Sequence, residues 1–121
     1  MSELFFATAF AFLATHELDA MRCREWRMHP FFSWMEEEAG RTAFVLAHVP
    51  VFAALFWFAF LTPDGALRTA TTFWISVFCI IHVGLHVAFL WHPKNEFRSL
   101  LSWSLIGGAG LFGVLDLGFR A

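Results

Sequence analysis

The sequence predicts an all-α protein, a four-helix transmembrane bundle with a short interfacial helix between helices one and two. Of its 121 residues, 59% are hydrophobic and 15% are charged. Soluble domains average about 45–50% apolar and about 25% charged residues. Four apolar stretches, at about 4–21, 42–61, 71–91 and 99–119, have roughly the ~20-residue length of a helix that crosses a bilayer. We therefore expect one integral-membrane domain, 1–121, with membrane lipid as its surroundings.

The first stretch, 4–21, is expected to remain as a membrane helix, because no basic segment or small-residue cleavage site marks it as a signal peptide. Its last third carries three ionisable residues, His16, Glu17 and Asp19. On a helix, His16 and Asp19 share a face, and Glu17 points about 100° away from His16. Ionisable side chains are costly inside a bilayer, so their presence indicates a functional use.

The segment 22–41 is the main polar stretch, and its arginines and tryptophans suit the headgroup level of a membrane. Pro30 is expected to open the short interfacial helix, which would end near Gly40. The run Glu36, Glu37 and Glu38 is most simply a solvated charge run. The sequence leaves open whether one of these carboxylates, or Glu96, reaches a site inside the bundle.

The second and third stretches contain the other buried histidines. His48 lies two positions before Pro50, which removes a backbone N–H and is expected to bend the helix beside that histidine. His82 and His86 are four positions apart, so they share one helix face. In the fourth stretch, glycines at 107, 108, 110 and 113 would let another backbone approach closely, either within the bundle or in a homo-oligomer. Asp116 and Arg120 are expected to form an exposed or snorkelling pair near the helix end.

Basic residues are unevenly distributed among the connecting segments. The first loop has four arginines and the third has Lys94 and Arg98, whereas the second loop has only Arg68. By the positive-inside rule, both termini are expected outside and the first and third loops in the cytoplasm. Counted from the cytoplasmic helix ends at about 1.5 Å per residue, the buried histidines then share one layer, roughly 7 to 14 Å deep.

Histidine and carboxylate side chains at one depth predict a metal site near the cytoplasmic side of the membrane. Imidazole and carboxylate ligands suit zinc or iron better than copper(I), and the number of groups allows one or two ions. Glu17 is expected to act as a general base, a second metal's ligand or a partner of the ligands. The predicted metal ligands are His16, Asp19, His48, His82 and His86.

The predicted function is a membrane-embedded metalloenzyme, catalysing metal-assisted hydrolysis or iron-dependent oxidation of a lipid-soluble or membrane-proximal small molecule. Three alternatives stay open: a b-type haem electron carrier with two histidine ligands, a small proton-coupled transporter using His16 or Glu17, and a structural or proton-relay network. The net charge of −2 gives no indication of a nucleic-acid partner.

The segment His16-Glu17-Leu18-Asp19-Ala20 resembles the first helix of small four-span bacterial membrane proteins that carry a His-x-x-Glu-Glu signature. Asp19 occupies the first acidic position of that signature, and Ala20 stands where the second acidic residue would be. The resemblance implies a multi-pass protein of the bacterial inner (plasma) membrane. It implies no activity.

Overall fold

The computed structural model describes residues 1–120. Within them all regular structure is helical, and each of the four long helical segments is long and apolar enough to cross a membrane. The predicted fold class is therefore confirmed. The elements are α1 (Ser2–Arg22), a short 3-10 helix η1 (Glu25–Arg27), α2 (Glu37–Phe56), its π-helical continuation η2 (Trp57–Leu61), α3 (Gly65–Ala88) and α4 (Leu100–Gly118).

The short helix between the first two spans lies earlier than the sequence suggested. It is η1, whereas the segment after Pro30 forms turns up to the start of α2 at Glu37. Glu37 and Glu38 occupy the first turn of α2, where negative charge is favourable beside the helix N-terminus. The acidic run thus lies at the start of α2, and Pro30 lies in the turns that precede it.

Side-chain caps fix where α3 and α4 begin. The Asp64 carboxylate accepts hydrogen bonds from the backbone N–H groups of Ala66 and Leu67, at 2.9 and 3.1 Å. The Ser99 hydroxyl accepts one from the Ser102 N–H at 3.0 Å. Both residue types satisfy backbone donors that have no partner within the first helical turn.

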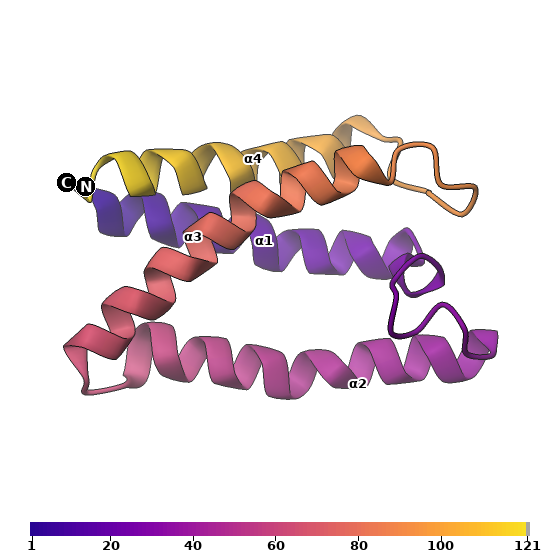
Figure 1. Cartoon of the computed structure of the whole chain (residues 1–121), viewed down its shortest axis with the longest axis horizontal. Coiled ribbons are helices and arrows are strands. Elements are labelled where there is room, and N and C mark those ends of the chain that lie inside the picture. The colour runs from indigo at the N-terminus through magenta and orange to yellow at the C-terminus, as the bar shows by residue number, and fades with distance from the viewer. Residues whose placement is uncertain (121) are drawn as a thin grey trace.

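The helices α1 and α3 both pack against α4, whereas α2 makes most of its contacts through η1 and η2 (Figure 1). The two chain termini and the α2–α3 connection lie at one end, and η1 and the α3–α4 loop lie at the other. The rings of Phe5 and Phe119, 5.1 Å apart, join the two terminal segments. The helix α3 crosses obliquely between α4 and the end of α2, so that α2 is held away from the other helices over much of its length.

A cavity of about 1020 Å³ lies along α2, with walls contributed by α1, η1 and α3. Most of its lining is apolar, including many aromatic rings. Its ionisable lining groups come from the last part of α1, from η1 and the turn after it, from the middle of α2 and from the last part of α3. These are Glu17, Glu25, His29, His48, His82 and His86. They therefore lie toward the η1 end, and the apolar part of the cavity extends the other way.

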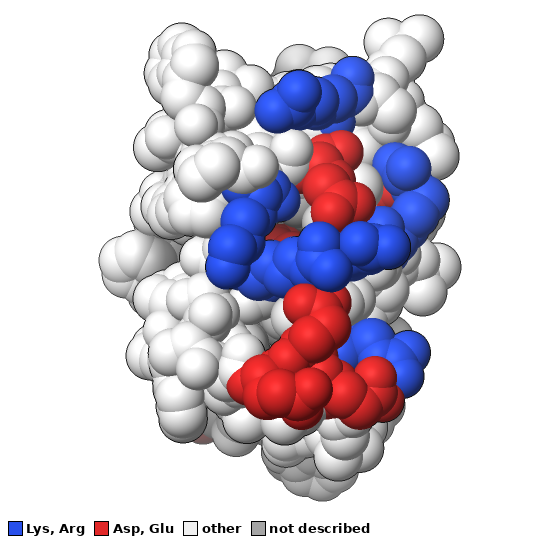
Figure 2. Space-filling view, turned by 90° about the vertical axis from the view of Figure 1, so that its right-hand side faces the viewer, with Lys and Arg blue, Asp and Glu red and all other residues white. Residues whose placement is uncertain are grey.

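The face at the η1 end gathers charged side chains of both signs (Figure 2). Arg27 bonds to Glu37 at the start of α2, with Nη2 2.9 Å from Oε1, and its Nη1 lies 3.5 Å from a carboxylate oxygen of Glu96 in the α3–α4 loop. Arg41 pairs with Glu38 at 2.6 Å. The charged residues of this end thus tie η1, α2 and the α3–α4 loop together outside the apolar spans.

Three glycines of α4, at 108, 110 and 113, serve packing within the chain. A Cβ placed on Gly108 would lie 2.6 Å from the ring of Phe12 on α1, and one on Gly110 would lie 2.5 Å from a methyl group of Val83 on α3. A Cβ on Gly113 would lie 2.8 Å from the backbone oxygen of Ser76, whereas Gly107 has nothing within 4 Å. A homo-oligomer through this helix stays a prediction, and its contact would have to use the side of α4 that carries Gly107.

We expect Gly113→Ala to destabilise the protein by about 1–3 kcal/mol, because the added methyl group meets backbone, which cannot move aside without shifting a helix. Gly107→Ala is the matched control and should leave stability unchanged or slightly raised, since its surroundings are open. Unfolding of both variants by detergent titration, followed by circular dichroism, measures the difference. Equal stability of the two variants would contradict the packing described here.

The pairing of Asp116 with Arg120 is confirmed, but its expected exposure is wrong. Asp116 is fully buried, and its Oδ2 accepts hydrogen bonds from Arg120 and from the Ser76 hydroxyl, both at 2.6 Å. Arg120 also donates to the Thr72 hydroxyl at 3.1 Å. The close approach of α3 at Gly113 explains the burial, because it brings Ser76 over the carboxylate.

Candidate metal centre

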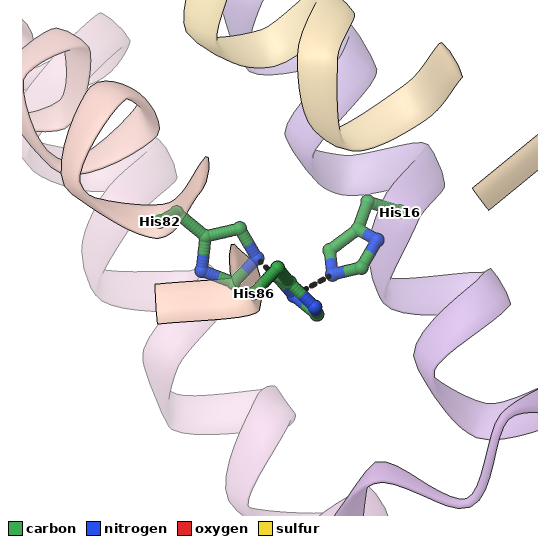
Figure 3. Close-up of side chains that lie close together, drawn as sticks. All are labelled: His16, His82 and His86. Carbon is green, nitrogen blue, oxygen red and sulfur yellow. Dashed lines mark hydrogen bonds between the residues drawn. The ribbon is translucent and has the colours of Figure 1, made fainter. Parts of the chain in front are cut away.

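His16 on α1 and His82 and His86 on α3 converge on one point inside the protein (Figure 3). One ring nitrogen from each lies within 4.8 Å of the other two, and all three side chains are buried. The Nε2 atom of His86 lies 3.1 Å from that of His82 and 3.2 Å from that of His16. This group could hold a metal ion.

Hydrogen bonds alone account poorly for this arrangement. In a neutral imidazole each ring nitrogen carries either one hydrogen or one lone pair, so His86 Nε2 would have to share a single hydrogen or a single lone pair between both neighbours, which is weaker than two separate hydrogen bonds. Ligands in neighbouring positions of a metal with bonds of about 2.0–2.1 Å are about 2.9–3.4 Å apart, for bond angles between octahedral and tetrahedral values. The observed spacings of 3.1 and 3.2 Å fall in that range.

The packing around the group fixes two of the rings and leaves one side open to the cavity. Phe97, in the α3–α4 loop, packs against His16 and His86 with ring centroids 5.3 and 4.6 Å away. His16 is fully buried and its Nδ1 has no hydrogen-bond partner in the described chain. His82 and His86 line the cavity. A ligand in the cavity could therefore reach an ion held by the histidines.

Asp19 does not join the three histidines. Its Oδ1 accepts a hydrogen bond from Arg22 Nε at 2.8 Å, and its Oδ2 lies 3.7 Å from the Cys23 sulfur. Arg22, three positions later on the same helix, also donates to the Ser102 hydroxyl of α4 at 3.2 Å. The Asp19 carboxylate is thus neutralised by Arg22, which also bonds to α4. Its role as a metal ligand stays a prediction.

His48 lies on the opposite wall of the cavity and contacts Glu17. Its Nε2 is 2.8 Å from Glu17 Oε2, and its Nδ1 is 2.6 Å from the backbone oxygen of Phe44. Because a carbonyl oxygen only accepts, Nδ1 carries a hydrogen, and the contact on the Nε2 side then requires one more proton. That proton lies either on His48 or on Glu17. The pair holds one transferable proton beside the cavity, while the predicted metal-ligand role of His48 stays a prediction.

Glu25, which the sequence did not single out, lies beside the histidines. Its Oε2 is 3.9 Å from His16 Nε2 and is buried without a hydrogen-bond partner in the described chain. Burial, reinforced by the nearby Glu17 charge, raises the pKa of Glu25 to about 8. Helical spacing could not reveal this neighbour, because it depends on a left-handed turn at Arg24 after α1 has ended. Of the other acidic residues left open, Glu37, Glu38 and Glu96 bond to arginines at the protein surface, and Glu36 is exposed.

Fold and site together define a class: a helical protein with four helices long and apolar enough to cross a membrane and a buried group of three histidines that could bind a metal ion. Residues 2–121 match the model of a family described as "Family of unknown function (DUF6713)". The chain belongs to this family. Comparison with the curated proteins and with the solved structures gives no match.

Proposed function

We propose that this protein is a membrane-embedded metalloenzyme that binds zinc or iron through His16, His82 and His86 and acts on a lipid-soluble substrate. The observation that carries the proposal is the convergence of three buried imidazoles at the wall of a large apolar cavity. When bound, such an ion supplies Lewis-acid activation of water or of a substrate oxygen, or, in the case of iron, redox chemistry. The protein's own side chains would bind the substrate and transfer protons.

The cavity supports a substrate with a long apolar body and one polar group. Its volume of about 1020 Å³ is at the upper end of ligand pockets, which span about 300–1,000 Å³. The ionisable lining groups lie toward the η1 end, and the rest of the wall is mostly apolar and aromatic. A substrate entering from the bilayer would place its polar group at the histidines and bury its apolar body along α2 and α3.

In this proposal Glu17 and His48 handle a proton. Their shared proton, implied by the 2.8 and 2.6 Å contacts of His48, can pass to or from a substrate group at the cavity wall. Phe44 positions the imidazole through its backbone oxygen, so that Nε2 is directed at Glu17. The pair is thus suited to general acid–base catalysis next to the metal centre.

A metal ion is better supported than the haem alternative. Axial ligands of a haem bind iron from opposite faces of the porphyrin. The ring nitrogens of His16 on α1 and His86 on α3, which belong to facing helices, are only 3.2 Å apart, too close for iron and a porphyrin to lie between them. The same convergence favours neighbouring coordination positions on a single ion.

The proposed orientation keeps both termini outside the bacterial inner membrane and the metal centre near the cytoplasm. It is supported by the arginines of the first loop and by Lys94 and Arg98 of the third, which connect the helices at the η1 end. Cysteine accessibility at the N-terminus and in the first loop tests it. A cytoplasmic N-terminus would reverse the orientation and leave the site geometry unchanged.

We expect Glu17→Gln to lower turnover by about 10²–10⁴-fold, the usual contribution of a general acid or base, without reducing the metal content. Metal-loaded and metal-stripped protein would be incubated with a membrane lipid extract, and substrate loss and product formation followed by mass spectrometry. Glu3→Gln is the matched control, because Glu3 is an exposed acidic residue at the other end of α1. Loss of the metal from Glu17→Gln would make Glu17 a ligand, and absence of any metal-dependent conversion would contradict the enzymatic function.

A further inference from the structure

Glu25 is half-buried, and one of its two carboxyl oxygens is fully buried without a partner in the described chain. Its Oε2 has no hydrogen-bond partner in the described chain, and the nearest ligand-type atom recorded for it is His16 Nε2 at 3.9 Å. A carboxyl oxygen buried without a partner is unfavourable, because it has lost its hydrogen bonds to water. The other two acidic residues of this region are already paired, Glu17 with His48 and Asp19 with Arg22. A cation at the three histidines would compensate the one carboxylate that remains.

The backbone directs Glu25 toward the histidines at some cost. Arg24 has φ 51° and ψ 46°, the left-handed conformation that non-glycine residues rarely adopt. This turn, directly after α1, reverses the chain and carries Glu25 back over the end of α1. Residues held in such conformations are strained and are concentrated at functional sites.

Contacts on both sides hold η1 in place. Trp26 is buried in an apolar cluster with Phe44 and Phe97. Arg27 bonds to Glu37 of α2 and lies 3.5 Å from Glu96 of the α3–α4 loop. Glu25 is therefore presented by a segment anchored to three parts of the protein, as a ligand requires.

Charge gives a further reason for a carboxylate at this point. Three neutral imidazoles would leave a divalent ion with its full charge of about +2 in apolar surroundings, and one carboxylate ligand reduces the net charge of the centre to about +1. The cost of burying the centre falls accordingly. Of the carboxylates near the histidines, Glu25 can take this role without giving up an existing partner.

We propose that Glu25 is the fourth protein ligand of the metal centre, which would make it a three-histidine, one-glutamate site. This inference rests on the metal centre of the proposed function and deepens it. A tetrahedral zinc ion with four protein ligands has no open position, whereas an octahedral ferrous ion keeps two for substrate or water. Ligation by Glu25 therefore favours iron over zinc as the metal of a catalytic centre.

Cobalt(II) binding to the metal-free, full-length protein in detergent tests the inference, because cobalt's visible absorption reports both affinity and coordination. We expect Glu25→Gln to raise the cobalt Kd by at least about 100-fold, beyond the about 10- to 100-fold effect of losing an outer partner, and to change the spectrum. Glu25→Asp, which keeps a carboxylate, should recover part of the affinity. Glu96→Gln is the matched control and should bind cobalt like the wild type, since Glu96 faces arginines.

The outcomes separate this inference from the proposed function. Wild-type affinity and spectrum in Glu25→Gln, together with loss of cobalt in His82→Ala, would overturn ligation by Glu25 and leave the three-histidine centre in place. A wild-type protein that takes up no cobalt would overturn both. Equal losses in Glu25→Gln and Glu96→Gln would also overturn ligation, since they would assign the effect to the general charge of the η1 end.

Discussion

His82→Ala and His86→Ala are each expected to remove the bound metal almost completely from the purified protein. Each substitution takes away one of three converging ring nitrogens, and His86 contacts both of the others, at 3.1 and 3.2 Å. The loss of one nitrogen ligand lowers the affinity of the centre, so that water and chelators present during purification should remove the ion. Elemental analysis of detergent-purified protein, expressed per chain, measures the loss.

The matched control is His92→Ala. His92 is in the loop after α3, where its Nδ1 accepts a hydrogen bond from the backbone of Lys94 at 3.2 Å, away from the three-histidine group. Its metal content should equal that of the wild type. Wild-type metal content in His82→Ala and His86→Ala, with the protein still folded, would show that the ion binds elsewhere.

Arg120→Met is expected to destabilise the protein by about 3–5 kcal/mol, the usual effect of removing one partner from a buried ion pair. The substitution leaves Asp116 fully buried with only the Ser76 hydroxyl to stabilise its charge. Detergent titration followed by circular dichroism measures the free energy of unfolding. Arg41→Met is the control and should cost less than about 1 kcal/mol, because the Arg41–Glu38 pair is exposed.

The double variant Asp116→Leu/Arg120→Met removes both charges and should recover most of the lost stability. Replacing a buried ion pair by apolar side chains of similar volume is often neutral or stabilising. A double variant less stable than Arg120→Met would contradict this explanation. It would mean that the pair contributes through its contacts to Thr72 and Ser76 rather than through mutual neutralisation.

The sequence predicted those features that depend on hydropathy and helical spacing. Apolar length located four spans, and the four-residue spacing of His82 and His86 placed both on the face that meets α1. The common depth predicted for the histidines also included His16, and the structure places His16 beside His82 and His86. These predictions depend only on the geometry of single helices and on which helix ends share a side of the membrane.

The sequence could not show which partner each polar side chain would contact. His16 and Asp19 share a helix face, but Asp19 turns to Arg22, a cation on its own helix. His48 was predicted as a metal ligand, which stays a prediction; in the structure it lines the cavity from α2 and contacts Glu17 of α1. Which partner each side chain contacts depends on the distances between the helices, and these distances cannot be predicted from hydropathy.

X-ray absorption at the metal edge of the metal-loaded, purified protein tests the central claim most directly, because it counts the imidazoles bound to the ion. A centre held by His16, His82 and His86 should give three imidazole ligands at about 2.0–2.1 Å, with the remaining positions taken by oxygen. That result should disappear in His82→Ala. Sulfur ligands at about 2.3 Å, or a shell with no more than one imidazole, would contradict the three-histidine centre.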